Sequence, residues 1–236
     1  MLNINKYFLL FFLLLIGINA YSQKHKKSQN LPSYDYQKIH FGFTLGINEL
    51  DFNLQKNSST ILNDSLKTLK SKSQKGFNLG IVTNIRIGRY TDLRFVPALI
   101  FGERQLEYNF TDGIEYTNEI KKIESTLIDF PVYVKYKSER YNNFRTYVIC
   151  GLKYSLDIAS QADINDEGQE IVKLQKNDIM GEIGFGLDFY LEYFKFSPQI
   201  KLSYGLLNLL KNEESVYTKS INKLTTNGWM LSFTFE

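Results

Sequence analysis

The sequence predicts an all-β protein, an eight-stranded antiparallel up-and-down transmembrane β-barrel. Three observations support this fold class: an export signal at the N-terminus, eight segments in which apolar and polar residues alternate, and connections that alternate between long and short. A period of two places successive side chains on opposite faces of a strand. Each segment therefore has one face suited to an apolar phase and one suited to a polar phase.

Residues 1–20 have the features of a signal peptide. Lys6 supplies a positive charge, residues 7–18 form an apolar run broken only by Gly17, and Ala20 is a small residue at a plausible cleavage point. The apolar run is shorter than the about 20 residues of a transmembrane helix. We expect cleavage near Ala20, and an uncleaved membrane anchor is the alternative.

The rest of the chain divides into two parts. Residues 21–38 predict a flexible periplasmic segment, because residues 24–30 are polar and basic without an apolar period, and contact with anionic headgroups or a partner is the alternative. Residues 39–236 predict one outer-membrane barrel domain. The net charge of +3 is too small to indicate nucleic acid as a partner, and the single cysteine, Cys150, excludes an intramolecular disulfide. No later apolar run has the length of a spanning helix, so a membrane-spanning chain must cross as strands.

The first strand is the clearest, because residues 39–48 alternate without exception. Apolar side chains occupy the odd positions, and histidine, glycine, threonine and asparagine occupy the even ones. Seven further segments repeat the pattern, and most reach the ~9–11 residues that a tilted spanning strand needs. The predicted strands are residues 39–48, 77–88, 93–102, 127–137, 144–156, 179–190, 194–206 and 229–236.

The connections predict the orientation of the barrel. An alternation of long and short connections is typical of outer-membrane barrels, in which the short turns are periplasmic. We therefore expect an outer-membrane protein of a Gram-negative bacterium with both termini in the periplasm. The long connections are residues 49–76, 103–126, 157–178 and 207–228, and the short ones are residues 89–92, 138–143 and 191–193.

Three prolines conflict with regular strand pairing. Pro97, Pro131 and Pro198 lie inside predicted strands, and a closed barrel has no free edge on which to place them. We expect a local bulge or interrupted pairing at each.

Alternation alone does not say which face points outward, because a soluble lipocalin-like barrel would place the apolar face inside. Three features favour lipid outside. The polar face is rich in glycine, which suits a narrow lumen, and the apolar faces carry no charge, as hydrocarbon requires at about 2–4 kcal/mol for a midplane Lys or Arg. The chain also ends in an alternating aromatic segment of the kind that barrel-assembly machinery reads during insertion. Its residues are Trp229, Leu231, Phe233 and Phe235.

The polar face predicts a charged lumen that side chains fill, because eight strands enclose little space. A porin channel is therefore not expected, and ion pairs and water should neutralise part of the charge. The surplus of positive charge is also suited to binding an anion or an acidic periplasmic segment. The charged residues expected in the lumen are Arg86, Arg94, Asp129, Lys135, Arg145, Lys153, Glu182, Asp188, Lys195 and Lys201.

The motifs of enzymes are missing from the sequence. It has only two histidines, His25 in the basic segment and His40 at the start of the first strand, and it has no Gly-x-Ser-x-Gly elbow. No Cys/His cluster with zinc-ligand spacing and no glycine-rich phosphate loop is present. We predict no catalytic residue, no cofactor and no metal. A lipid-modifying enzyme that uses His40 or a loop serine is the least favoured alternative.

Several stretches carry a resemblance to a known family. Residues 124–137 with 147–154, and residues 197–208 with 231–236, resemble the core of the Bacteroidetes outer-membrane β-barrel family. Residues 31–48 are similar to the segment that leads into the first strand in the PorT family of the type IX secretion system.

The resemblance implies a non-enzymatic factor for the export of C-terminally tagged proteins, including motility adhesins in gliding relatives. It implies other secretion-system proteins as partners. The barrel pattern adds outer-membrane lipids, the C-terminal aromatic segment adds the barrel-assembly machinery, and the small net charge argues against nucleic acid. The alternative function is a surface interaction or adhesion barrel that acts through its long extracellular loops.

Overall fold

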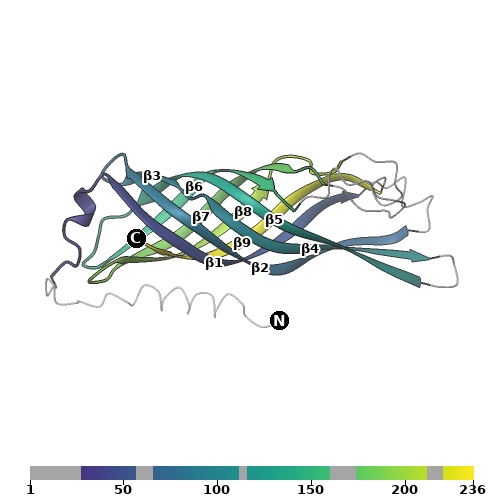
Figure 1. The fold of residues 1–236 in the computed structure, drawn as a ribbon, viewed down its shortest axis with the longest axis horizontal. Coiled ribbons are helices and arrows are strands. Elements are labelled where there is room, and N and C mark those ends of the chain that lie inside the picture. Colours follow the sequence, from purple (N-terminus) through teal and green to yellow (C-terminus); the bar gives the residue numbers. More distant parts are fainter. Residues whose placement is uncertain (1–27, 57–65, 112–115, 160–173, 212–219) are drawn as a thin grey trace, which may run out of the picture.

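Antiparallel strands close into a barrel in the computed structural model, which describes residues 28–56, 66–111, 116–159, 174–211 and 220–236 (Figure 1). The predicted signal peptide, residues 1–20, and residues 21–27 lie outside the described part of the chain. Within the described part, no helix is long and apolar enough to cross a membrane.

Each strand pairs with its neighbours in the chain, and β9 pairs with β1 to close the ring. β3 and β4 together occupy the place of the predicted strand 93–102, and both pair with β2 and β5, which leaves eight positions around the barrel. The predicted fold class is confirmed. The elements are η1 (Tyr34–Tyr36), β1 (Ile39–Lys56), β2 (Leu66–Arg86), β3 (Thr91–Phe95), β4 (Ala98–Thr111), β5 (Tyr116–Lys137), β6 (Phe144–Asp157), β7 (Asn177–Tyr190), β8 (Lys195–Gly205) and β9 (Ile221–Phe235).

The three prolines interrupt pairing as predicted, without shifting the register. Pro97 separates β3 from β4, and the pairing of both strands with β5 skips the positions of Pro97 and Pro131. The pairing of β7 with β8 skips Pro198. On their other sides Pro131 stays in register with Lys153 and Pro198 with Phe233. Each proline therefore lies where at least one neighbouring ladder lacks a pair, because proline has no N–H to donate.

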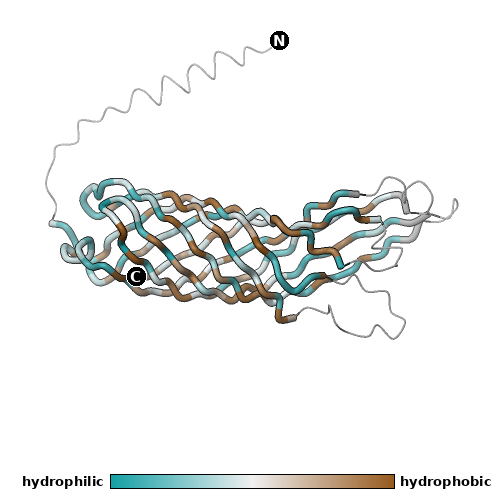
Figure 2. The backbone as a smooth tube through the Cα atoms, turned by 90° about the horizontal axis from the view of Figure 1, so that it is seen from above, coloured by the Kyte–Doolittle hydropathy of each residue, from teal (hydrophilic) through white to brown (hydrophobic). Residues whose placement is uncertain are grey.

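The apolar face of the predicted strands points outward. On β1, Phe41 is 68 % exposed, whereas its neighbour His40 is 8 % exposed and Thr44 is buried. The same alternation of hydrophobic and hydrophilic residues is visible along the other strands in Figure 2. The barrel therefore presents an outer apolar band and a polar interior, as a membrane-spanning barrel requires.

The two longest predicted connections are largely wrong, because the strands continue into them. β1 extends to Lys56 and β2 begins at Leu66, so most of residues 49–76 is strand; β4 and β5 likewise take up most of residues 103–126. Pairing continues outward to Leu50 with Gln74 and to Thr111 with Tyr116.

An inversion of polarity explains these strand extensions. On β1, Ile47 faces outward and Asn48 inward, but Leu50 and Phe52 face inward beyond them and Glu49 faces outward. The extensions thus bury an apolar core and expose polar side chains to water, which stabilises strand pairing beyond the membrane. This extension core consists of Phe52, Leu69, Leu106, Tyr108, Leu174, Leu209, Leu210, Ile221 and Leu224.

The two ends of the barrel differ. Short turns of residues 87–90, 138–143 and 191–194 lie at one end, together with η1 and the C-terminal residue Glu236 (Figure 1). We call this the short-turn end. The strand extensions point to the opposite end, which we call the extension end.

Candidate functional site

The structure places nine of the ten charged residues predicted for the lumen in the barrel interior, where they are buried. The tenth, Arg86, is half-buried at the short-turn end. The nine are Arg94, Asp129, Lys135, Arg145, Lys153, Glu182, Asp188, Lys195 and Lys201.

One group of these charges lies at the middle of the barrel. The Lys153 ammonium is 2.9 Å from an Asp129 oxygen and 3.0 Å from a Glu182 oxygen. Tyr133 donates a hydrogen bond to Glu182, and Lys201 donates to the Tyr133 hydroxyl at 3.1 Å. The charges from four strands therefore compensate one another, as groups removed from water must.

A second group lies toward the short-turn end. Lys135 and Asp188 form an ion pair at 2.8 Å, and the Lys135 ammonium also lies 3.6 Å from the centre of the Tyr147 ring. Arg94 pairs with Glu236 at 2.5 Å, and Lys195 pairs with the same carboxylate.

Sequence reasoning missed several members of these groups. Glu236 and Lys137 lie on the polar faces of the predicted strands 229–236 and 127–137, but they are not among the charged residues predicted for the lumen. Lys137 pairs with Asp92 at 2.6 Å. The alternation of side chains along the two strands was the signal that could have found Glu236 and Lys137. The other buried charged residues that were not predicted lie in the predicted connections 89–92, 103–126 and 157–178. They are Asp92, Arg104, Asp157 and Asp178.

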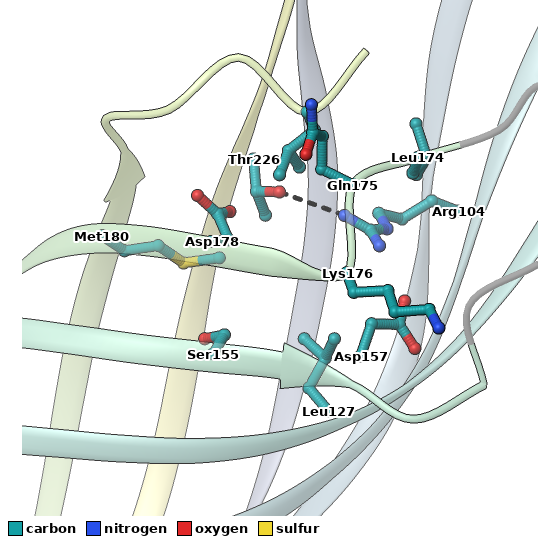
Figure 3. A pocket seen from close by; sticks show the side chains of 11 residues that line it. Arg104, Leu127, Ser155, Asp157, Leu174, Gln175, Lys176, Asp178, Met180 and Thr226 are labelled. Atoms are coloured by element: carbon teal, nitrogen blue, oxygen red, sulfur yellow. Dashed lines mark hydrogen bonds between the residues drawn. The ribbon is translucent and has the colours of Figure 1, made fainter. Parts of the chain in front are cut away.

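Side chains of the described residues leave little space at two interior cavities of the lumen. One cavity lies beside Lys153, Tyr133 and Met230, and the other lies near the extension core; each has a volume of about 10 Å³. In the second, Asp178 and Arg104 face one another with Thr226 hydrogen-bonded to Arg104 (Figure 3). Such a volume holds about one water molecule, so neither cavity is suited to an organic ligand.

The chain that precedes β1 packs against the short-turn end. The Tyr34 hydroxyl donates to Glu236 at 2.7 Å and accepts from Lys195 at 2.8 Å. His40 donates from Nε2 to the Tyr34 carbonyl at 2.8 Å, and the two rings stack with centroids 3.9 Å apart. Burial raises the pKa of the Tyr34 hydroxyl, and the Glu236 carboxylate beside it raises the pKa further. His40 thus serves to hold this segment.

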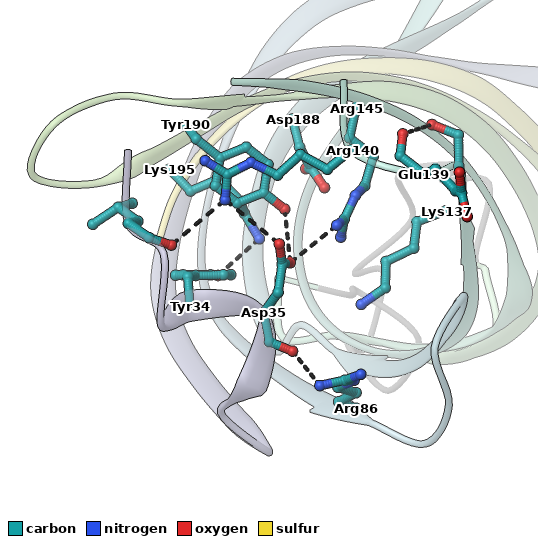
Figure 4. A network of polar contacts seen from close by, with 12 residues as sticks. Tyr34, Asp35, Arg86, Lys137, Glu139, Arg140, Arg145, Asp188, Tyr190 and Lys195 are labelled. Atoms are coloured by element: carbon teal, nitrogen blue, oxygen red, sulfur yellow. Dashed lines mark hydrogen bonds and ion pairs between the residues drawn. The ribbon is translucent and has the colours of Figure 1, made fainter. Parts of the chain in front are cut away.

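Asp35 is held beside Tyr34 by cationic side chains (Figure 4). Its carboxylate lies 3.0 Å from Arg145 and 3.5 Å from Arg140, and Tyr190 donates to it at 3.3 Å. Arg86 donates to the backbone carbonyl of Asp35. Four residues from separate turns and strands therefore converge on this one residue.

These contacts differ from the expectation that residues 21–38 are a flexible segment. Asn30 donates from its backbone to Asn143 at 2.9 Å and from its side chain to the Tyr190 carbonyl at 3.0 Å. Together with Tyr34 and Asp35 these bonds tie residues 30–37, here named the docked segment, to the barrel. The physical reason is the buried positive charge of the barrel end, which the carboxylate of Asp35 helps to neutralise.

A cleft of about 470 Å³ opens beside the docked segment, and we call it the mouth cleft. Cations dominate its lining, because five Arg and Lys side chains face only two carboxylates. An excess of one charge in a recess concentrates its field on ions of opposite sign. The charged residues of the cleft are Asp35, Arg86, Arg89, Lys137, Glu139, Arg140 and Arg145.

Metal chemistry has no candidate site in the described part of the chain. No group of three or more His, Cys, Asp or Glu side chains is close enough there to hold an ion. The excess of cations in the mouth cleft suits it to binding an anion through arginine hydrogen bonds.

Comparison with known protein families decides the class of this barrel. Residues 21–211 match the outer membrane protein beta-barrel domain family. The chain belongs to this family. Its members are outer-membrane barrels, so the apolar band of this barrel lies in the outer membrane. No curated protein matches the chain.

Solved structures similar to this member of the outer membrane protein beta-barrel domain family include three bacterial barrels. OprG from Pseudomonas aeruginosa is 15 % identical, with a TM-score of 0.44, covering 84 % of this chain and 95 % of its own. Neisserial surface protein A is 13 % identical, with a TM-score of 0.42, covering 84 % and 97 %. Ail of Yersinia pestis, solved with the heparin analogue sucrose octasulfate, is 12 % identical, with a TM-score of 0.38, covering 84 % and 99 %.

Proposed function

We propose that this barrel is a non-enzymatic component of the type IX secretion system, which exports C-terminally tagged proteins, and that it acts through protein contacts. The observation that carries the proposal is the resemblance of residues 31–48 to the PorT family. The same stretch includes most of the docked segment and contributes Asp35 and Tyr36 to the mouth cleft. Part of the stretch that carries the resemblance thus lines a polar recess.

Two physical features support a role in protein contacts. The interior cavities hold about one water each, so this lumen is poorly suited to conducting solutes. The short-turn end carries a charged recess instead. We place this end, with both termini, in the periplasm, since short turns of outer-membrane barrels are periplasmic.

Deletion of the gene in its own bacterium tests the proposal. Tagged cargo should accumulate in the periplasm, and the wild-type chain supplied from a plasmid should restore its release; in a gliding species, motility should be lost as well. The matched control is deletion of another barrel of the same family. Normal cargo release in the deletion strain would contradict the proposal.

A surface-binding barrel is the second candidate, and the strand extensions favour it. They carry polar side chains on their outer face and project from the apolar band at the extension end. This function predicts that shortening β4 and β5 by a matched number of residues abolishes attachment of cells to their ligand while cargo release stays intact. Attachment that survives the shortening would remove this candidate.

A further inference from the structure

The mouth cleft holds more positive charge than its own residues neutralise. Arg86 donates to the backbone carbonyls of Asp35 and Gly88, and no carboxylate in the described residues pairs with it. Arg89 pairs with Glu139 at 3.1 Å, but this pair is exposed, since the two side chains are 76 % and 70 % accessible. Exposed pairs contribute only about 0–1 kcal/mol, so Arg89 is available to another anion.

The docked segment shows how a peptide carboxylate fits this recess. Asp35 reaches Arg140 and Arg145, whose side chains are only 5 % and 8 % accessible. The Nε of Arg145 is buried and has no hydrogen-bond partner in the structure, so this guanidinium retains a free donor. Buried guanidinium groups bind carboxylates strongly through charge-assisted hydrogen bonds.

We propose that the mouth cleft binds an acidic peptide segment of a partner protein, whose carboxylates pair with Arg86 and Arg89 and displace Asp35 from Arg140 and Arg145. This inference rests on the proposed function for its periplasmic setting. It adds the chemistry of the partner and assigns the docked segment as a tethered competitor for the same site.

The position of the cleft favours a peptide over a phospholipid headgroup. Arg140 and Arg145 are recessed and lie against the ring of Tyr190, the Arg140 guanidinium 3.7 Å and the Arg145 guanidinium 5.6 Å from its centre. Headgroups surround the outside of a barrel, whereas the docked segment already brings a peptide carboxylate into the recess. A volume of about 470 Å³ accommodates several acidic side chains.

A direct binding measurement tests the inference. The probe is a fluorescein-labelled peptide of alternating Glu and Gly, titrated by anisotropy with the purified mature chain in neutral detergent at about 50 mM salt. We expect saturable binding that weakens as salt rises. R86Q/R89Q should weaken it about tenfold or more. The matched control is K70Q/K72Q, which removes two positive charges from the outer face of β2 in the strand extension and should leave the affinity unchanged.

The tethered-competitor step has its own variant. D35N removes the internal carboxylate, so it should tighten peptide binding by roughly threefold to tenfold, because the intramolecular competitor is lost. Heat-dependent mobility in electrophoresis verifies that each variant is folded. Binding that D35N weakens would overturn the displacement. If R86Q/R89Q binds the peptide with the affinity of the wild type, the proposed site is overturned. It is also overturned if the wild-type chain binds phosphatidylglycerol vesicles but does not bind the peptide.

The outcome is separable from that of the secretion test. Peptide binding by the wild-type chain together with normal cargo release in the deletion strain rejects the proposed function alone. A block of cargo release in the deletion strain together with no peptide binding rejects the mouth cleft alone.

Discussion

The last residue of the chain, Glu236, forms a buried ion pair with Arg94, which lies 142 positions earlier in the sequence, with 2.5 Å between the charged groups. Lys195 shares the same carboxylate, and Tyr34 donates to it from the docked segment. A single side chain therefore joins the first and last parts of the barrel at the short-turn end.

Removing this carboxylate should strongly destabilise the barrel. Glu236→Gln leaves Arg94 and Lys195 buried without their counter-charge, which costs about 3–5 kcal/mol. Urea unfolding in lipid vesicles, followed by the fluorescence of the single tryptophan Trp229, measures the loss. Glu139→Gln breaks an exposed pair and should cost less than about 1 kcal/mol. Similar losses of unfolding free energy for the two variants would contradict the role of Glu236 as a buried counter-charge.

Close packing at a glycine of β7 makes a second prediction. A Cβ at Gly186 would lie 2.3 Å from the ring of Tyr147, which is buried and hydrogen-bonded to Gln199 at 2.9 Å. Gly186→Ala should therefore destabilise the barrel by about 1–3 kcal/mol, since the ring cannot shift freely. At Gly181 on the same strand a Cβ meets nothing within 4 Å, so Gly181→Ala is the control. Equal unfolding midpoints for both variants would count against this packing.

The inversion of polarity along β1 predicts where charge is tolerated. Phe43→Arg places a cation in the apolar band and should cost about 2–4 kcal/mol of folding free energy in a bilayer. Asn53→Arg lies on the outer face of the extension and should change stability by less than about 0.5 kcal/mol. Folding yields in vesicles measure both. A large cost at Asn53 would move the membrane boundary outward.

Tyr34 gives the docked segment a dependence on pH. Its pKa is raised by burial and by Glu236, so the folded state keeps the proton while the unfolded chain loses it above about pH 10. The stability contributed by Tyr34 is thus present below pH 10 and falls above it by up to about 1.4 kcal/mol per pH unit. Urea unfolding of the wild type and Tyr34→Phe at pH 8 to 11 should show that the difference between their free energies of unfolding narrows as the pH rises above 10. Parallel curves would rule this out.

The alternation of residues predicted the barrel well but missed the strand extensions. Residues 49–55 also alternate, with Leu50 and Phe52 on the face that was polar up to Asn48. The predicted strand ended where the apolar phase changed sides, because a spanning strand keeps its apolar face in lipid. Outside the membrane the preference reverses, since water then surrounds the outer face and the extension core fills the interior.

The docked segment was not predictable from local sequence. Its partners lie far along the chain, as Asn143 does for Asn30 and Arg145 for Asp35. Nothing in a polar stretch indicates which distant charges it will neutralise. Parity could place the lumen charges on one face, but only the register of the strands shows that Lys135 meets Asp188 and that Lys137 meets Asp92.

The strand extensions carry the described part of the chain well beyond the lipid. β4 and β5 remain paired to Thr111 and Tyr116, about ten residues beyond the apolar band, which at ~3.3 Å per residue and a tilt near 45° corresponds to a height of roughly 23 Å. In the proposed orientation, these two paired strands project from the lipid on the outside of the cell. Their stiffness comes from backbone pairing, so the reach is built into the barrel itself.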